Sequence, residues 1–233
     1  MSLLERLMSE GTLTVTGRLV DASNATLYGT IVEGEDEVRV IYKPVAGERP
    51  LWDFPDGNLA QREYAAFLIS EMGGWNLVPL TILRDGPFGI GMVQQWIDID
   101  ESVDLALFYR EDHESLRAMA LFDAVVNNTD RKIGHLIPSR DGKLFGCDHG
   151  VTFHEEDKLR TVLWQWASQK FSDQELEQLQ KLRQSLISKE GLFTSLISDI
   201  EFKALLGRID RLLDERTFPE PSDQWPAVPW PPF

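Results

Sequence analysis

The first third of the chain alternates between hydrophobic and polar positions in the manner of β-strands. Residues 38–44 (VRVIYKP) alternate and are rich in β-branched side chains, so we expect a strand with Lys43 near its end. Residues 26–32 supply its partner, preceded by a small polar turn, DASNA. Backbone N–H groups of such a turn can point at an anion, which makes Ser23 and Asn24 candidate phosphate-binding residues. The turn is neither a Walker A loop nor the three-glycine loop of protein kinases.

Two later stretches have the apolar spacing of helices. Residues 58–72 carry apolar side chains at helical intervals, with Glu63 in the first half and two glycines after the end as a stop signal. Residues 114–126 show a second apolar stripe, which two asparagines interrupt. We expect this second helix to deliver the polar loop that follows it, with Asp123 bracing the loop from below.

The chain after Gly150 is mainly helical by pattern and ends in a different composition. Residues 172–175 (SDQE) form a capping box, and residues 200–213 are amphipathic. The tail, residues 218–233, is rich in proline and tryptophan and should be extended. It is either a strap across its own lobe or a partner-binding segment; we favour the strap because exposed indoles are costly.

Two short polar motifs flank a predicted hairpin in the middle of the chain. The first, NNTDRKIGH, contains Asp130, and the second, CDHG, contains Asp148. Asp141 and Gly142 between them are a type I′ turn signal, so two short strands should return the chain to its starting edge. The two aspartates then lie at the same end of the hairpin. The alternative is a pair of ordinary loop acids beside a surface hairpin.

Kinase-type chemistry needs residues of these types in this order. One loop aspartate orients or deprotonates the acceptor hydroxyl, and a second holds the magnesium that bridges the nucleotide phosphates. A strand lysine paired with a helical glutamate fixes an ammonium against the α/β-phosphates, as Lys43 and Glu63 would. Taken singly, residues such as Lys43 and Glu63 are more often a solvated strand-end lysine and a helix-surface acid. Their order before Asp130 and Asp148 favours the functional interpretation.

The order Lys43, Glu63, Asp130, His135, Asp148 resembles the phosphatidylinositol 3-/4-kinase-like branch of the protein-kinase-like superfamily. It is most similar to a family of small bacterial proteins with a DRKxGH loop. The resemblance spans residues 17–150 and implies a two-lobed fold with ATP and Mg²⁺ or Mn²⁺ in the cleft. It implies that Lys43 holds the phosphates, that Glu63 positions Lys43, that Asp130 serves the acceptor and that Asp148 binds the metal.

His135 stands where that branch has a metal-binding asparagine. Magnesium prefers oxygen ligands. His135 therefore assists with manganese, contacts a phosphate as a donor, or marks a protein that binds nucleotide with little or no turnover. With His149, His154 and Cys147 it also raises the alternative of a zinc site, although no Cys-x-x-Cys or His-Glu-x-x-His spacing is present.

Residues 89–97 (GIGMVQQWI) resemble the hinge that joins the lobes of such proteins and holds adenine. Gln95 and Trp96 would then lie at the adenine. The alternative is a buried strand whose tryptophan fills the core. The two are compatible, because an adenine pocket is itself mostly apolar with a few fixed polar groups.

Composition and charge narrow the compartment and the partners. The single cysteine excludes an intrachain disulfide, and neither a secretory signal nor an apolar run of ~18 residues is present, so we expect a cytoplasmic protein. The formal charge of -15, from 38 acidic and 23 basic side chains, repels polyanions. We therefore expect no nucleic-acid partner and no stable membrane association. A local basic patch at Arg131, Lys132 and Lys143 could still attract phosphates.

The sequence thus predicts an α+β, two-lobed protein-kinase-like fold with a β-rich N-lobe and a mainly helical C-lobe. We expect the N-lobe at residues 1–94, the C-lobe at 95–217 and the extended tail at 218–233. The expected function is ATP-dependent phosphoryl transfer to a hydroxyl of a protein or a small polar molecule. The alternatives are a non-catalytic nucleotide-binding sensor or scaffold, or an enzyme that transfers AMP.

Overall fold

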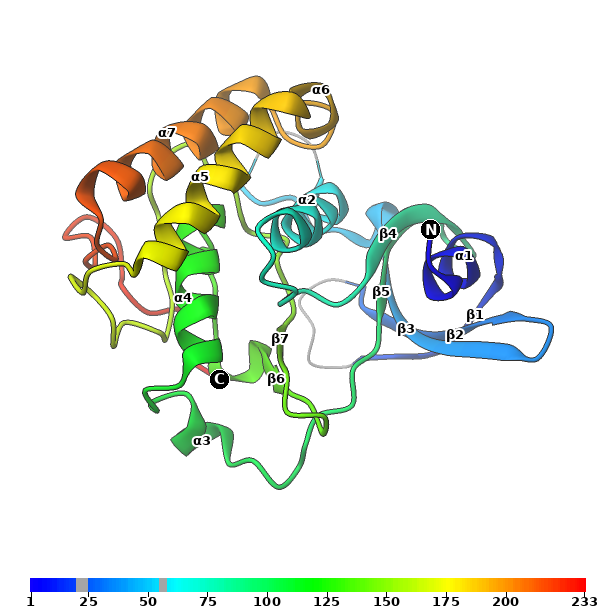
Figure 1. Cartoon of the computed structure of the whole chain (residues 1–233). Helices are drawn as coiled ribbons and strands as arrows, with labels where there is room; N and C mark the ends of the chain where they lie inside the picture. The colour runs from blue at the N-terminus through cyan, green and yellow to red at the C-terminus, as the bar shows by residue number, and fades with distance from the viewer. Residues whose placement is uncertain (20–24, 55–57) are drawn as a thin grey trace.

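The computed structural model describes residues 1–19, 25–54 and 58–233, which form two lobes (Figure 1). The N-terminal lobe is an antiparallel sheet of five strands in the order β1-β2-β3-β5-β4. Its strands are β1 (Thr12–Arg18), β2 (Leu27–Glu33), β3 (Asp36–Pro44), β4 (Thr81–Gly86) and β5 (Gly89–Gln95). The other lobe is mainly helical. The predicted α+β class, with a β-rich N-lobe and a helical C-lobe, is confirmed.

Strand β3 divides its side chains between two environments. Val40 and Tyr42 are fully buried on one face, where helix α1 (Leu3–Glu10) covers the sheet with Leu7. Because side chains alternate along a strand, Ile41 and Lys43 lie on the opposite face, toward the cleft. The period of two thus places the lysine on the cleft side. After β3 the chain makes one turn of 3₁₀ helix, η1 (Val45–Gly47).

Helix α2 (Leu59–Met72) lies between the sheet and the helical lobe (Figure 1). The Asn58 side chain caps its first turn by accepting from the Gln61 N–H, and the helix ends at Gly73. Both faces are covered, so even Arg62 and Glu63 are buried. A helix enclosed in this way has a fixed position relative to both lobes.

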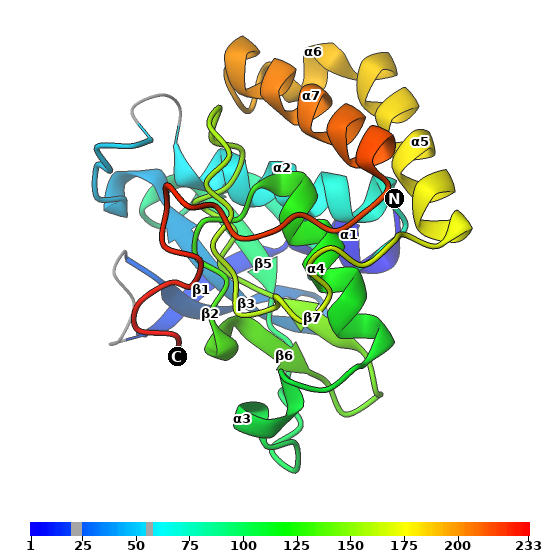
Figure 2. The same cartoon turned by 90° about the vertical axis from the view of Figure 1, so that its left-hand side faces the viewer.

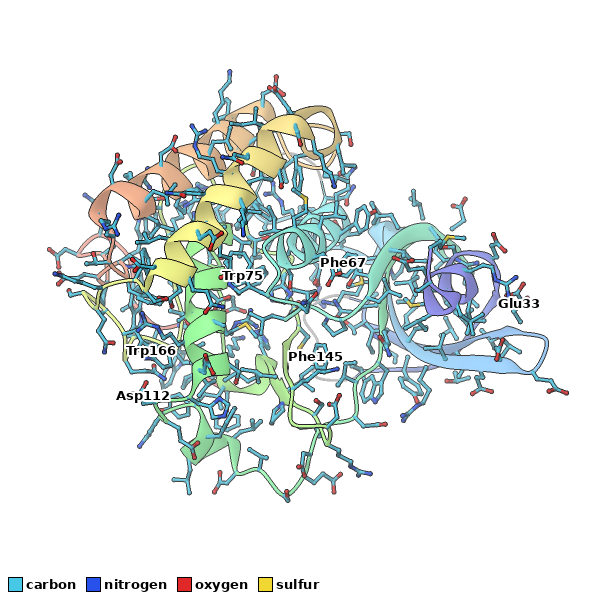
Figure 3. All side chains as sticks on the ribbon, in the orientation of Figure 1. Glu33, Phe67, Trp75, Asp112, Phe145 and Trp166 are labelled. Carbon is cyan, nitrogen blue, oxygen red and sulfur yellow. The ribbon has the colours of Figure 1, made fainter. Side chains whose placement is uncertain are left out.

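The C-terminal lobe is built around α4 (Glu114–Val126), which is almost entirely buried. Trp75 packs edge-on against Phe122 of α4, and the Trp166 indole donates to Asp112 at 3.0 Å (Figure 3). The other helices are α3 (Leu105–Phe108), α5 (Asp173–Ser188), α6 (Glu190–Phe193) and α7 (Asp199–Glu215). Within the described ranges, no helix combines the length and apolar character needed to cross a membrane.

The short hairpin of this lobe differs from the predicted one at its turn. Strands β6 (Leu136–Pro138) and β7 (Leu144–Gly146) pair as expected, after a 3₁₀ turn, η2 (Ile133–His135). A type I′ turn needs a positive φ at both central residues, but only Gly142 has one, at 79°. The Gly142 N–H instead donates to the Ser139 carbonyl, and Ser139 N–H to Lys143. The type I′ prediction is wrong, because the loop is longer than a two-residue turn. The Asp-Gly pair lies one position later than the two central residues of the turn that Ser139 begins.

The tail that follows α7 lies against its own lobe (Figure 2). The Ala227 carbonyl accepts from the Thr161 N–H at 3.1 Å and from the Trp164 indole at 2.8 Å, and the Pro232 carbonyl accepts from the Ile133 N–H at 2.8 Å. We expected a strap because exposed indoles are costly. That reason is wrong for Trp230, whose residue is 90% exposed. These hydrogen bonds, together with the Trp225 ring over Lys158 Nζ at 4.4 Å, hold the tail in place.

Candidate active site

Lys43, Glu63 and Asp148 come from three separate elements and meet in the cleft. Lys43 Nζ lies 2.5 Å from Glu63 Oε1 and 2.8 Å from Asp148 Oδ1. Glu63 projects from α2, and its second oxygen accepts from the backbone N–H of His149 at 2.9 Å. Asp148 has φ 62°, a left-handed conformation that Asp adopts more readily than most residues. Sheet, helix and loop therefore converge on one cluster with a formal charge of minus one.

Charge and burial act against each other in this cluster. Burial disfavours the Lys43 ammonium, but Asp148 and Glu63 outweigh that effect and raise its pKa. Lys43 in turn holds the pKa of Asp148 far below its usual range. Burial raises the pKa of Glu63, and Lys43 opposes that rise. Asp148 is therefore ionised at neutral pH and, with 52% of its side chain exposed, is accessible to a cation.

Asp130 lies in the loop between α4 and η2. Its carboxyl is part-buried and pairs with Lys132, whose Nζ is 3.3 Å from Asp130 Oδ2. Burial raises the pKa of Asp130; Lys132 opposes this, and the nearby negative charge of Asp148 adds to it. The backbone N–H of Asp130 donates to Asn128 Oδ1 at 3.0 Å, which fixes the turn that presents it. A carboxyl with a raised pKa in this position is suited to receiving a proton.

Arg131 is a structural residue beneath this loop. Its guanidinium is fully buried and pairs with Asp123 of α4 at 2.8 Å, so Asp123 does brace the loop from below. It also donates to the Cys147 carbonyl at 3.3 Å and to His149 Nε2 at 2.7 Å. Arg131 thus ties the Asp130 loop to the Asp148 loop. The predicted basic patch is wrong at this residue, because a fully buried guanidinium cannot attract an external phosphate.

His135 lies beside Asp148, with its Nε2 atom 3.6 Å from Asp148 Oδ2. Burial, opposed by Asp148 and reinforced by nearby cations, lowers the pKa of His135 to about 4. The imidazole is neutral at pH 7. Its Nδ1 atom accepts weakly from the Lys132 N–H at 3.5 Å, and its Nε2 atom can bind a cation once the ring proton is on Nδ1.

The zinc alternative is wrong for the described residues, because they contain no group of three His, Cys, Asp or Glu side chains placed to hold a metal ion. The other two histidines of the predicted set are committed elsewhere. His149 Nε2 faces Arg131, and His154 Nε2 lies 3.0 Å from Lys158 Nζ.

A cavity of about 260 Å³ opens beside the cluster. Lys43, Asp148, His135, Gln95 and Trp96 are all among its lining residues. Both predicted hinge residues therefore border the same space as the charged cluster. Their backbone N–H groups are not available to a ligand, because that of Gln95 donates to Leu80 and that of Trp96 to Arg39.

The predicted phosphate-binding turn is not tested by the described residues. Ser23 and Asn24 lie outside the described residues. Leu19 and Thr26, on either side of that gap, both line the cavity.

Several cavity residues were not among the predicted site residues. Ile41 and Ile137 supply apolar surface, and Gln94 contributes a buried amide; Cys147, predicted only as a zinc ligand, also lines the cavity. The alternation of β3 offered a signal for Ile41, since it shares a face with Lys43. Nothing in the sequence separated Gln94 from its neighbour Gln95. A second cavity, of about 290 Å³ between α4, α7 and the tail, holds none of the predicted site residues.

Solved structures of kinases share this fold. The Golgi casein kinase superposes with a TM-score of 0.57 at 12% identity, covering 91% of this chain and 73% of that chain. The same kinase with Mn/ADP bound gives 0.57 and covers 74% of that chain. The Helicobacter pylori proinflammatory kinase CtkA gives 0.50 at 11% identity, covering 91% of this chain and 94% of that chain. The protein therefore has a protein-kinase-like fold, as predicted.

A curated relative defines the family more narrowly. Protein Rv2133c of Mycobacterium tuberculosis (strain ATCC 25618 / H37Rv) is 41% identical over 263 aligned positions, which cover 97% of this chain and 94% of the relative. The chain belongs to the family of this protein. No protein-family model matches the sequence.

Proposed function

We propose that the protein is an ATP-dependent phosphotransferase that acts on a hydroxyl of a protein or a small polar molecule. The observation that carries the proposal is the contact of Lys43 with both Glu63 and Asp148 at the edge of a cavity large enough for a purine. A part-buried lysine, fixed by a helical glutamate and facing a loop aspartate, is the arrangement that kinase-type phosphoryl transfer uses. The Golgi casein kinase, which has a similar fold, was solved with Mn/ADP bound, and this supports a nucleotide and a metal as the ligands.

Each residue has a role that its surroundings fit. Lys43 would contact the phosphates, and Glu63 would hold its ammonium in place. Asp130, with its raised pKa, would accept the proton of the acceptor hydroxyl or orient that hydroxyl. These roles, together with the adjacent residues Asp130 and Arg131 and with Asp148, also support the more specific resemblance to the phosphatidylinositol 3-/4-kinase-like branch. The net charge of -15 favours an acceptor that is neither nucleic acid nor an anionic lipid surface.

The metal would be held by Asp148 with assistance from His135. One ionised carboxylate and one neutral imidazole are too few to hold a free ion, and no third side chain joins them within the described residues. Two protein donors do fit a cation that takes its other ligands from phosphate oxygens and water. When bound, such a cation supplies charge neutralisation on the phosphates. We therefore expect metal affinity to depend on nucleotide, with manganese favoured by the imidazole.

The experiment is metal-dependent ATP consumption by the full chain, measured with Mg²⁺ and with Mn²⁺. Asp148→Ala removes the metal-binding carboxylate, and we expect turnover to fall by at least about a hundredfold. Asp36→Ala is the matched control, because Asp36 is exposed at the opposite end of β3 from Lys43. Turnover that survives Asp148→Ala would contradict the assignment.

Radiolabel placement separates the remaining alternatives. Transfer from γ-labelled ATP marks a kinase, whereas transfer only from α-labelled ATP marks an AMP transferase. Nucleotide binding that needs Asp148 but shows no turnover with either metal marks a sensor, the outcome to which His135 in place of asparagine points.

A further inference from the structure

Gln94 is a buried amide in the wall of the nucleotide cavity with most of its hydrogen-bonding capacity unused. Its side chain is 5% exposed and lines the same cavity as Lys43 and Asp148. It shares a sheet face with Ile41 and Thr81, which pair with it from β3 and β4. The amide therefore sits on the cleft side of the sheet, directly before the hinge residues Gln95 and Trp96.

The neighbouring threonine fixes which way the amide points. The Thr81 hydroxyl donates its proton to the Pro79 carbonyl at 2.8 Å. Because a carbonyl can only accept, the Thr81 oxygen must in turn accept from the atom at 2.9 Å, which has to be Gln94 Nε2. A flipped amide would set Gln94 Oε1 against a hydroxyl with no proton left to give. The orientation of Gln94 therefore follows from the hydrogen bonds alone.

The amide oxygen is left without a protein donor among the described residues. Three buried polar atoms of the described residues have no hydrogen-bond partner: Glu33 Oε2, Trp75 Nε1 and His149 Nδ1. The Gln94 oxygen is not one of these three buried atoms. The oxygen is therefore not sealed off from solvent, and Gln94 lines the cavity. The oxygen and the second N–H of the amide have no protein partner among the described residues, so both remain for a ligand.

We propose that Gln94, held in one orientation by Thr81, reads the purine base of the nucleotide and selects adenine. The inference rests on the proposed function and names the residue that sets its base specificity. Adenine offers an N6 amino donor beside the N7 acceptor, and a glutamine amide matches this pair with its oxygen and its N–H. Guanine and hypoxanthine keep N7 but place an acceptor, O6, where the donor was. That oxygen would face the Gln94 oxygen.

The expected preference for ATP over ITP can be estimated from one such pair of hydrogen bonds between an amide and a base. A bidentate amide contact discriminates against the wrong base by about 5- to 150-fold in affinity. ATP and ITP are the cleanest probes, because hypoxanthine replaces the N6 amino group by O6 and adds no 2-amino group. We expect the wild-type chain with Mn²⁺ to bind ATP at least about fivefold more tightly than ITP.

Two variants test the mechanism. Gln94→Met keeps the length of the side chain but removes both polar groups, so the ATP/ITP ratio should fall to near one, mainly through weaker ATP binding. Thr81→Val frees the amide to flip, so the ratio should narrow through tighter ITP binding, whereas Thr81→Ser keeps the hydroxyl and should preserve the ratio. Gln180→Met is the matched control, since Gln180 is exposed on α5. Thermal unfolding verifies that each variant is folded.

The outcomes separate this inference from the proposed function. Equal affinity of the wild-type chain for ATP and ITP, or a ratio unchanged by Gln94→Met, overturns base selection by Gln94 while leaving a nucleotide-binding protein. A ratio unchanged by Thr81→Val overturns the orienting role of Thr81. Binding of neither triphosphate by the folded wild-type chain overturns the proposed function and this inference together.

Discussion

Arg131→Met should destabilise the protein more than any change at an exposed cationic residue. The guanidinium is fully buried and pairs with Asp123, which is also fully buried. Methionine fills a similar length but leaves the Asp123 carboxylate without its cation. The change also removes the donors to the part-buried Cys147 carbonyl and to the buried His149 Nε2.

The magnitude follows from the cost of an unpaired buried charge. Removing one partner of such a pair costs about 3–5 kcal/mol of unfolding free energy. For a chain of this size, 1 kcal/mol shifts the melting temperature by about 2–4 °C, so the expected drop is roughly 6–20 °C. Replacing both partners, in Asp123→Leu with Arg131→Met, should recover a large part of the loss, because no buried charge is then left alone.

Urea unfolding of the two single variants and the double variant measures the coupling between the two side chains. Arg140→Met is the matched control, since Arg140 is exposed in the β6–β7 loop, and it should lie within about 0.5 kcal/mol of the wild type. A loss below about 1 kcal/mol for Arg131→Met, or losses of the two single variants that simply add, would refute the role of this pair as the anchor of the site.

Three further predictions concern the site and the tail. Glu63→Gln removes the charge that fixes Lys43, so kcat should fall by about a hundredfold with a smaller change in nucleotide affinity; equal losses in both would contradict a positioning role. Burial, with the charge of Asp148, raises the pKa of Cys147 to about 12, so iodoacetamide at pH 8 should modify the folded chain about a hundredfold or more slowly than the unfolded chain, with the rate rising with pH. A thiol that reacts equally fast in both states would show that it is not buried. Deleting residues 225–233 should speed amide hydrogen exchange at Ile133, which loses its acceptor in the tail, and unchanged exchange would show that the tail does not hold this loop.

The sequence predicted most of the fold because its local signals agree with one another. The alternation over β3, the cap and glycine stop of α2, and the capping box of α5 each define an element that the structure contains. The hairpin turn failed because an Asp-Gly pair is compatible with more than one loop length. Nothing local decides between those lengths; the pairing register of β6 and β7 does.

The site was predictable only as far as residue order allowed. Lys43, Glu63 and Asp148 could be proposed because their order and elements resemble a known arrangement, and the structure brings these three together. The burial of Arg131 and the orientation of Gln94 depend on contacts with Asp123 and Thr81 that no sequence spacing encodes. Burial decides whether a guanidinium attracts a phosphate or anchors a loop.

The most direct test is a crystal structure of the protein with manganese and a non-hydrolysable ATP analogue. We expect an anomalous manganese peak within coordination distance of the Asp148 carboxylate, about 2.1 Å for a hard divalent cation. We also expect phosphates beside Lys43 and an adenine amino group at Gln94. A nucleotide bound elsewhere, or a manganese ion that Asp148 does not contact, would contradict the proposed site.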